Sequence, residues 1–227
     1  MYKYFFKRLI DFFLSLMGIL VLALPMLIIA IIIKIDSPGP VFFKQKRIAK
    51  GKRHFNILKF RSMPVSAPHD TPTHQLKDAE SMLTRWQRFM RKSSIDELPQ
   101  LFCILVGSMS IIGPRPALWN QEDLIAERDK YGANDIKPGL TGLAQISGRD
   151  ALAIEVKAEL DGKYAAALNA GFFRGVAMDI KCFFGTVKSV LCSDGVVEVG
   201  TGKLEEQATA TPEAESAPEQ EEQEVTL

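Results

Sequence analysis

The sequence predicts an α/β protein, a small membrane-associated domain with an N-terminal re-entrant helix broken at a proline, a β-hairpin and interfacial amphipathic helices. Residues 12–33 form an uncharged apolar run, residues 41–60 contain two β-prone segments around a basic turn, and later apolar residues recur at helical spacing. We therefore expect a membrane helix over residues 1–36, a folded domain over 37–202 and an acidic, disordered tail over 203–227.

Charge is unevenly distributed along the 227 residues, although the formal net charge is only +1. Residues 204–227 carry 8 acidic and no basic residues, whereas the first 61 residues hold 12 Lys or Arg against only Asp11 and Asp36. A basic segment beside an apolar one is typical of contact with anionic lipid or a phosphorylated substrate. We expect membrane lipid as a partner and no nucleic acid.

The apolar run "FFLSLMGILVLALPMLIIAIII" covers residues 12–33, which is 22 residues. As a helix it would extend about 33 Å, enough to cross a hydrocarbon core of about 30 Å. No A-x-A cleavage site follows it, and the run is too long for a signal peptide. The sequence therefore predicts a helix that meets a membrane.

Basic residues lie on both sides of this run. Lys7 and Arg8 precede it, and Lys34 and Lys44 begin the series that follows it. Because Lys and Arg accumulate on the cytoplasmic side of a membrane helix, both flanks are predicted to lie there. Pro25 removes a helical hydrogen bond near the middle. We favour a helix that is broken at Pro25 and returns to the same face, over a kinked helix that crosses.

The folded domain is expected to begin with a turn at "SPGP" (37–40) and a short hairpin that ends at "HFNILKF" (54–60). Residues 64–76 are predicted to be a loop, and a helix is predicted from Leu76 to about Lys92. The apolar stretch 100–113 is too short to span a membrane and predicts a buried or interfacial helix. The glycines of "KPGLTGLAQISGRD" (137–150) predict a loop that approaches a ligand, and a further helix is expected from Ile154.

Two adjacent carboxylates, Asp96 and Glu97, stand between a basic segment and an apolar one. Ser94 and Glu97 have the spacing of a helix capping box, so capping is one interpretation. The other interpretation is chemical: an Asp96 at a helix start would stay ionised and could attack phosphorus to form an acyl phosphate. An adjacent carboxylate suits Mg²⁺, which takes oxygen ligands and bridges substrate phosphates.

Basic residues near turns and strand ends supply candidate phosphate contacts. Arg91 precedes the carboxylates, Lys59 lies in the second β-prone segment, and Arg115 and Arg149 lie in turn-rich segments. Arginine can hold a phosphate with two parallel hydrogen bonds. With a membrane helix nearby, this set points to phosphoryl chemistry on a lipid.

The cysteines and histidines carry no comparable signal. The three cysteines form no CxxC pair and lie in apolar surroundings, which predicts buried thiols in a reducing compartment. The three histidines, at positions 54, 69 and 74, have no metal-ligand spacing.

Five motifs in order resemble the bacterial sugar transferase family, the small monotopic phosphoglycosyl transferases. They are "KRLIDFFLSLMGILVLALPML", "SPGPVFFKQKR", "ILKFRSM", "SIDELPQLFCILVGSMSIIGPRP" and "KPGLTGLAQISGRD", and the resemblance covers about residues 1–200. It implies that residues 37–202 are a catalytic domain on the cytoplasmic face of the bacterial inner membrane, initiating a cell-surface glycan ahead of downstream glycosyltransferases.

The resemblance also implies a two-step reaction. Asp96 attacks the β-phosphate of a UDP-sugar and releases UMP, and undecaprenyl phosphate then takes the phosphosugar from Asp96. Glu97 is implied as the ligand of Mg²⁺. Substrate contacts are implied for the charged motif positions Lys59, Arg91, Arg115, Arg149 and Asp179.

The sequence departs from the family pattern at two places. Leu143 replaces a usual aromatic residue, and the segment before Asp179 is longer than usual, which leaves the role of Asp179 open. Two alternatives remain: a non-catalytic basic membrane-bound interaction protein, in which the carboxylates only cap a helix, and a direct glycosyltransferase that releases UDP.

Overall fold

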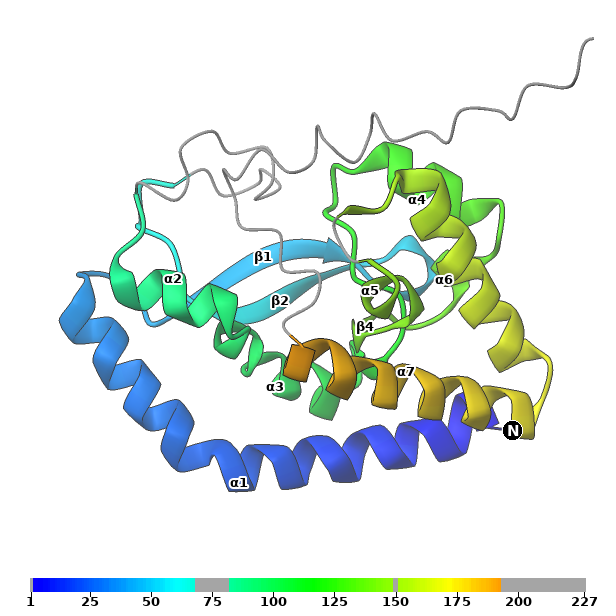
Figure 1. The fold of residues 1–227 in the computed structure, drawn as a ribbon, viewed down its shortest axis with the longest axis horizontal. Coiled ribbons are helices and arrows are strands. Elements are labelled where there is room, and N and C mark those ends of the chain that lie inside the picture. Colours follow the sequence, from blue (N-terminus) through cyan, green and yellow to red (C-terminus); the bar gives the residue numbers. More distant parts are fainter. Residues whose placement is uncertain (1, 68–81, 149–150, 193–227) are drawn as a thin grey trace, which may run out of the picture.

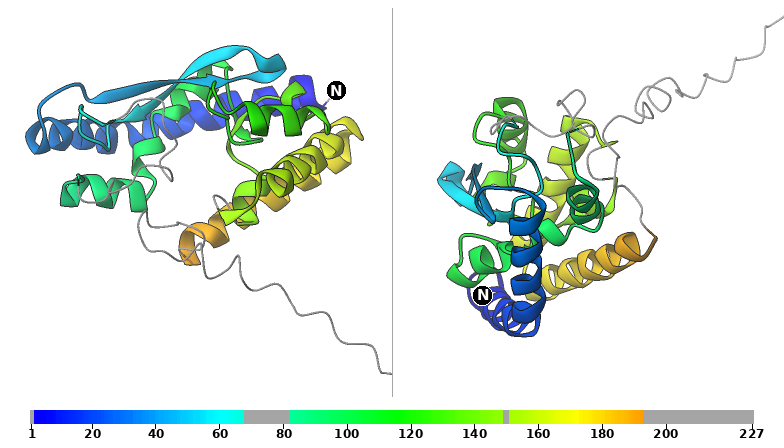
Figure 2. Two further views of the ribbon diagram at one scale, coloured as in Figure 1. Left: turned by 90° about the horizontal axis from the view of Figure 1, so that it is seen from above. Right: turned by 90° about the vertical axis from the view of Figure 1, so that its left-hand side faces the viewer.

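The fold combines helices with two small sheets, as the computed structural model of residues 2–67, 82–148 and 151–192 shows (Figures 1 and 2). The chain begins with a π-helical turn, Tyr2–Phe6, that leads into α1, Lys7–Asp36. The tail over 203–227 and Arg149 lie outside the described residues, so the predictions made for them stay predictions. The expected mixture of helices and a hairpin after an apolar N-terminal helix is confirmed.

Helix α1 is continuous through Pro25, so the predicted break at this residue is wrong. Figure 1 shows the helix bent, with its concave side facing the rest of the protein. Loss of one backbone donor bends a helix without ending it when packing holds both halves. Met26, Ile29 and Ile33 supply that packing for the second half, against Phe60 and Met90.

The predicted hairpin is confirmed. Strand β1 (Phe42–Ile48) pairs antiparallel with β2 (His54–Phe60), and Phe42 lies opposite Phe60. The turn between the strands contains a short 3₁₀ helix, Lys50–Lys52. Gly51 in this turn has φ 67°, a left-handed conformation that glycine adopts without strain.

Helix α2 covers Arg85–Lys92, so it begins later than the predicted Leu76. Residues 82–84 are not helical, and residues 76–81 lie outside the described part. Thr84 forms a capping box with Gln87, which fixes the start of the helix. Apolar spacing alone does not register such a start signal.

A 3₁₀ turn, Ile95–Glu97, follows and leads into α3, Gln100–Val106. The predicted helix over 100–113 is therefore only half helical. Gly107, with φ 89°, ends α3, and the chain continues as strand β3, Ser110–Ile112. Helix α3 packs against α1, and Gly18 allows close contact with Leu101.

Strand β3 pairs in parallel with β4, Gly139–Thr141. A Cβ atom on Gly139 or Gly142 would collide with the backbone of Gly113. These two glycines therefore allow β4 and the residue after it to approach the chain at the end of β3.

The remaining secondary-structure elements of the described chain are helices. It comprises α4 (Glu122–Asp129), a 3₁₀ turn (Ala133–Asp135), α5 (Leu143–Ile146), α6 (Ile154–Asn169) and α7 (Phe172–Cys192). Helices α6 and α7 pack against each other, and Tyr164, Leu168 and Cys182 join Tyr2 in one core cluster.

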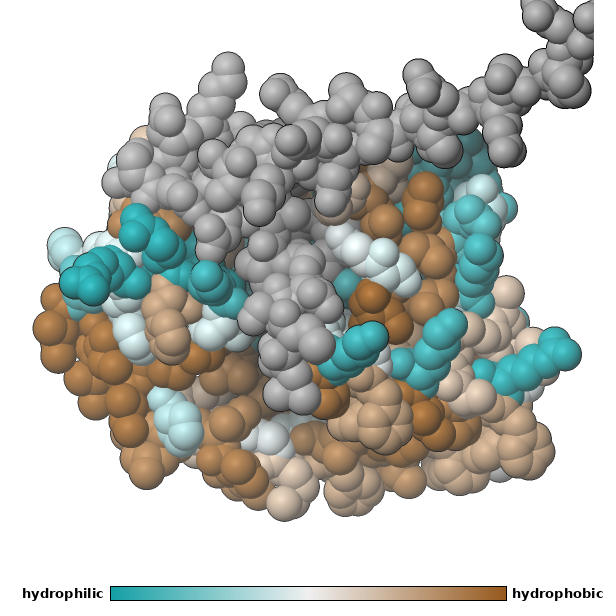
Figure 3. Space-filling model, in the orientation of Figure 1, coloured by the Kyte–Doolittle hydropathy of each residue, from teal (hydrophilic) through white to brown (hydrophobic). Residues whose placement is uncertain are grey.

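Apolar side chains gather on the outer side of α1, along the lower edge of Figure 3. Leu20, Val21 and Leu24 are among those exposed on α1, and Phe173 and Phe184 are exposed on α7. By length and composition, the helix Tyr2–Asp36 could cross a membrane. An exposed apolar surface of this kind marks a site of contact with a membrane or a partner.

Candidate active site

The carboxylate pair lies in the 3₁₀ turn between α2 and α3. Ser94 precedes the turn with φ 56° and makes no side-chain capping bond, so the predicted Ser94–Glu97 capping box is wrong. The capping box of this region is formed instead by Thr84 and Gln87, at the start of α2. Capping therefore does not account for the two carboxylates.

Asp96 is buried, with only 7% of its surface exposed. The Ser62 hydroxyl donates a hydrogen bond to its Oδ2 atom at 3.3 Å. Burial raises the pKa of Asp96 because it disfavours the charged form, and the nearby charge of Glu97 raises it further. Lys59, Arg91 and Ser62 act in the opposite direction and favour the ionised carboxylate.

Glu97 lies between two cations. The Lys59 ammonium is 2.6 Å from Glu97 Oε1, and the Arg115 guanidinium is 3.4 Å from the same oxygen. Lys59 comes from β2 and Arg115 from the "GPRP" segment, so residues 38 and 18 positions away along the chain meet at this carboxylate. The structure thus brings Lys59 and Arg115 to Glu97, and the charge of Arg91 acts on Asp96. The phosphate contacts predicted for these three residues stay predictions.

The backbone of Arg115 is held by a buried ion pair that sequence reasoning missed. Arg128 Nη2 donates to the Arg115 carbonyl at 2.9 Å and to Asp161 Oδ2 at 2.6 Å. Both side chains of the Arg128–Asp161 pair are nearly inaccessible to solvent. Their separation of 33 residues left no local pattern from which the pair could have been predicted.

Arg61 is a second missed residue, and it fixes the strand end beside the site. Its guanidinium donates to the carbonyl oxygens of Ser37 and Pro38 at 2.7 and 2.6 Å. These bonds tie the turn after α1 to the end of β2, next to Ser62 and Lys59. The position of Arg61 in the "KFRSM" motif was a signal that could have been used.

Asp179 lies on α7, in a buried cluster with the N-terminal segment. Its Oδ2 atom accepts hydrogen bonds from the Tyr2 hydroxyl at 2.5 Å and the Lys7 ammonium at 2.8 Å. The Tyr164 hydroxyl donates to Oδ1 at 2.6 Å. Burial and the Asp179 charge raise the pKa of Tyr164, so its hydroxyl stays protonated and donates. These contacts give Asp179 a role in attaching α1 to α6 and α7.

The carboxylate pair fits a magnesium ion that the protein and the substrate phosphates would hold together. Within the described ranges, no cluster of three or more His, Cys, Asp or Glu side chains could hold a metal ion on its own. Mg²⁺ is usually bound through one or two carboxylates together with substrate phosphates and water. Asp96 and Glu97, two adjacent oxygen donors, match that requirement.

Comparison with known proteins identifies the family. The model of the family "Bacterial sugar transferase" matches residues 2–193. An uncharacterized sugar transferase EpsL of Bacillus subtilis is 38% identical over 190 residues, covering 84% of this chain and 89% of the relative. The exopolysaccharide production protein PSS of Rhizobium leguminosarum is 36% identical over 196 residues, covering 82% and 94%.

A larger relative shares a shorter region. A protein of Xanthomonas campestris named UDP-glucose:undecaprenyl-phosphate glucose-1-phosphate transferase is 44% identical over 146 residues. The match covers 63% of this chain but only 30% of that relative. The predicted family is confirmed, and this chain belongs to the bacterial sugar transferase family.

Proposed function

We propose that this protein is a phosphoglycosyl transferase that moves a sugar 1-phosphate from a UDP-sugar to undecaprenyl phosphate. The carrying observation is the buried Asp96 carboxylate beside Glu97, with Lys59 and Arg115 in contact with Glu97. Relatives named as UDP-glucose:undecaprenyl-phosphate or UDP-N-acetylgalactosamine-undecaprenyl-phosphate sugar phosphate transferases support both substrate classes.

In the first step an Asp96 carboxylate oxygen attacks the β-phosphorus of the UDP-sugar. A new oxygen–phosphorus bond forms, and the bond between the β-phosphorus and the bridging oxygen breaks, so UMP leaves with that oxygen. The product is a sugar phosphate joined to Asp96 as an acyl phosphate. Burial makes Asp96 a poorly solvated nucleophile, while Lys59 and Arg91 oppose its protonation.

In the second step an oxygen of undecaprenyl phosphate attacks the same phosphorus. The bond to Asp96 breaks, which gives undecaprenyl diphosphate-sugar and restores the free carboxylate. Lys59 and Arg115, which contact Glu97, would also contact the negative phosphate oxygens, which two carboxylates would otherwise repel. Arg91 adds a further positive charge near Asp96.

Glu97, with Asp96 beside it, would hold Mg²⁺ when substrate is bound. The ion would supply charge neutralisation and polarisation at the phosphates.

We place the catalytic domain on the cytoplasmic face of the inner membrane, with α1 entering the bilayer and returning to the same face. At the start of α1, Tyr2 and Lys7 bind Asp179 of α7. At its end, Asp36 accepts a hydrogen bond from the Thr84 hydroxyl at 2.7 Å. Because one folded domain contacts both ends of α1, the two ends belong on one side of a bilayer about 30 Å thick.

A role as a non-catalytic interaction protein is less well supported, because the capping function that it assigns to Asp96 is not observed. We further propose that the product initiates a cell-surface glycan and passes to downstream glycosyltransferases. The name of the Rhizobium relative, an exopolysaccharide production protein, supports this proposal.

The experiment is UMP release from a panel of UDP-sugars, with Mg²⁺ and undecaprenyl phosphate in nanodiscs. The wild type should release UMP in the presence of lipid acceptor from at least one donor, and Asp96→Asn should lose this activity. Asp135→Asn, which alters an exposed aspartate outside the site, is the matched control and should retain it. Release of UDP would instead support a direct glycosyltransferase, and equal UMP release by Asp96→Asn would contradict the nucleophile.

A further inference from the structure

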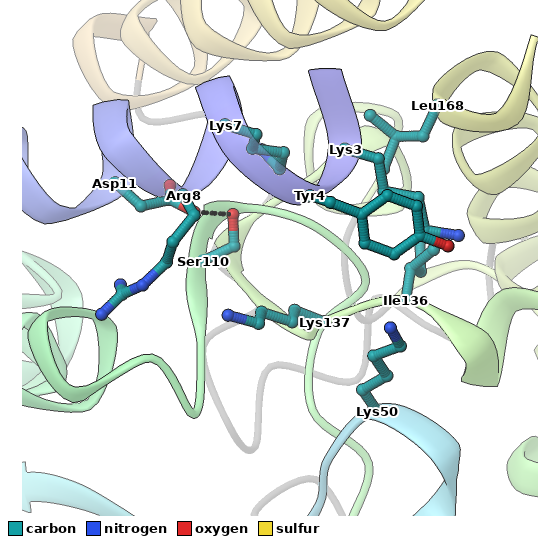
Figure 4. A pocket seen from close by; sticks show the side chains of 10 residues that line it. All are labelled: Lys3, Tyr4, Lys7, Arg8, Asp11, Lys50, Ser110, Ile136, Lys137 and Leu168. Carbon is teal, nitrogen blue, oxygen red and sulfur yellow. Dashed lines mark hydrogen bonds between the residues drawn. The ribbon is translucent and has the colours of Figure 1, made fainter. Parts of the chain in front are cut away.

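A basic cavity of ≈ 240 Å³ lies beside the first turns of α1 (Figure 4). Its lining contains five cationic side chains from three parts of the chain: Lys3, Lys7, Arg8, Lys50 and Lys137. Asp11 is the acidic residue in this lining. Neither Asp96 nor Glu97 belongs to it, so this cavity differs from the candidate active site.

Some of these cations already have partners. Lys7 is paired with Asp179, Lys3 donates to the Asn169 side chain, and Arg8 donates to the carbonyl oxygens of Ile104 and Leu105. Asp11 accepts from two neutral donors, the Ser110 hydroxyl and the Ile111 amide. The carboxylates of Asp11 and Asp179 leave the group of five cations with a net positive charge.

Lys137 is the unusual member of this group. Within residues 2–67, 82–148 and 151–192, its ammonium makes no hydrogen bond or ion pair, although the residue is half-buried. Figure 4 shows it between Arg8 and Lys50. Burial lowers the pKa of Lys137, and Arg8, Lys50 and Lys7 lower it further, while Asp11 opposes them. A bound anion would offset this repulsion.

The cavity adjoins an exposed apolar surface. It is lined by the N-terminal π-helical turn and the first turns of α1, and the same π-helical turn exposes Tyr4 (69%) and Phe5 (58%). Basic groups beside an apolar surface bind the headgroups of anionic lipids. Lysine binds phosphate as a compact charge, and three rotatable donors let it adapt to the group.

We propose that this cavity binds the phosphate group of an anionic membrane lipid, with Lys137 and Lys50 as its main contacts. A soluble phosphate ester offers the same chemistry, and the experiment separates the two sources. The inference does not rest on the transferase reaction, because it concerns a different set of residues and its readout is binding.

The test is amine-reactive labelling of the full-length protein in nanodiscs, with labelling of Lys137 followed by peptide mass spectrometry. Nanodiscs of phosphatidylcholine alone are compared with nanodiscs that also contain phosphatidylglycerol, and a third sample has glycerol phosphate added to phosphatidylcholine nanodiscs. An anion at Lys137 raises the pKa of its ammonium, and a rise of about one pH unit lowers the fraction of reactive free amine about tenfold. We expect slower labelling with phosphatidylglycerol.

Two variants make the result specific. Lys50→Met should reduce the protection of Lys137 by phosphatidylglycerol, whereas Lys181→Met, at an exposed lysine on α7, should leave it unchanged. Protection by phosphatidylglycerol alone assigns the site to a lipid headgroup, and protection by glycerol phosphate as well assigns it to phosphate esters in general. Equal labelling in all three samples, or equal loss of protection in both variants, would overturn the proposal.

Discussion

The Lys59 ammonium lies 2.6 Å from Glu97 Oε1, and this contact joins the β-hairpin to the carboxylate pair. Burial raises the pKa of the neighbouring Asp96, and the same lysine is the largest influence that lowers it. One side chain therefore neutralises the proposed metal ligand and favours the reactive form of the proposed nucleophile.

Replacing Lys59 should move the pH dependence of activity. In Lys59→Met the pKa of Asp96 rises further, so the acid limb of the kcat/KM profile should move to higher pH. If the midpoint of that limb rises by about one pH unit, the activity measured on the limb falls about tenfold. Steady-state rates of UMP release across pH measure this, with Lys44→Met on the exposed side of β1 as the control. An unchanged acid limb would show that Lys59 does not set the pKa of Asp96 in the active enzyme.

Asp96→Asn should raise the melting temperature at neutral pH while it removes activity. The raised pKa means that folding favours protonated Asp96, so ionised Asp96 costs stability above its folded pKa. The neutral amide avoids this cost. The difference should disappear below pH 3.8, the ordinary pKa, where Asp96 is protonated in both states. Thermal unfolding without Mg²⁺ across pH measures it, and a lower melting temperature for Asp96→Asn at neutral pH would contradict the assignment.

Breaking the Arg128–Asp161 pair should destabilise the fold and displace Arg115. Asp161→Ala leaves a buried guanidinium without its carboxylate, which costs about 3–5 kcal/mol. The control Lys163→Ala breaks an exposed ion pair with Glu159 and should change stability by less than about 1 kcal/mol. Denaturant unfolding in detergent measures the free energy of unfolding of both variants. Similar values for the two variants would show that the Arg128–Asp161 pair does not support the fold.

The Asp179 cluster should hold the start of α1 in place. Asp179→Ala removes the acceptor of Tyr2, Lys7 and Tyr164 and leaves Lys7 buried without its ion-pair partner, at a cost of about 3–5 kcal/mol. Hydrogen exchange of residues 2–11 should become faster in this variant. If exchange stays unchanged while the KM for the UDP-sugar rises, Asp179 acts on substrate instead.

The topology of α1 predicts a labelling pattern. Tyr4→Cys and Pro40→Cys, introduced singly with Cys192 replaced by serine, place exposed thiols at the two ends of the helix. Both should be protected from a membrane-impermeant reagent in intact cells and labelled after lysis. Labelling of one position alone in intact cells would establish a crossing helix.

The sequence was sufficient for the hairpin and the apolar helix, because each rests on a local pattern. Motifs also singled out Lys59, Arg91 and Arg115 as phosphate contacts, and that role stays a prediction. The Arg128–Asp161 pair and the three donors around Asp179 depend on contacts between distant segments, which no local pattern encodes. Ser94 and Glu97 have the spacing of a capping box, but the left-handed backbone of Ser94 prevents it.

The most direct test is a search for a phosphosugar on Asp96. Purified protein in nanodiscs is incubated with its UDP-sugar and Mg²⁺ but no undecaprenyl phosphate, and the peptide that contains Asp96 is examined by mass spectrometry. The proposed mechanism predicts about one UMP released per active site and a matching sugar phosphate on this peptide, which later addition of undecaprenyl phosphate removes. Release of UMP only when acceptor is present, with the Asp96 peptide unmodified throughout, would contradict the covalent mechanism.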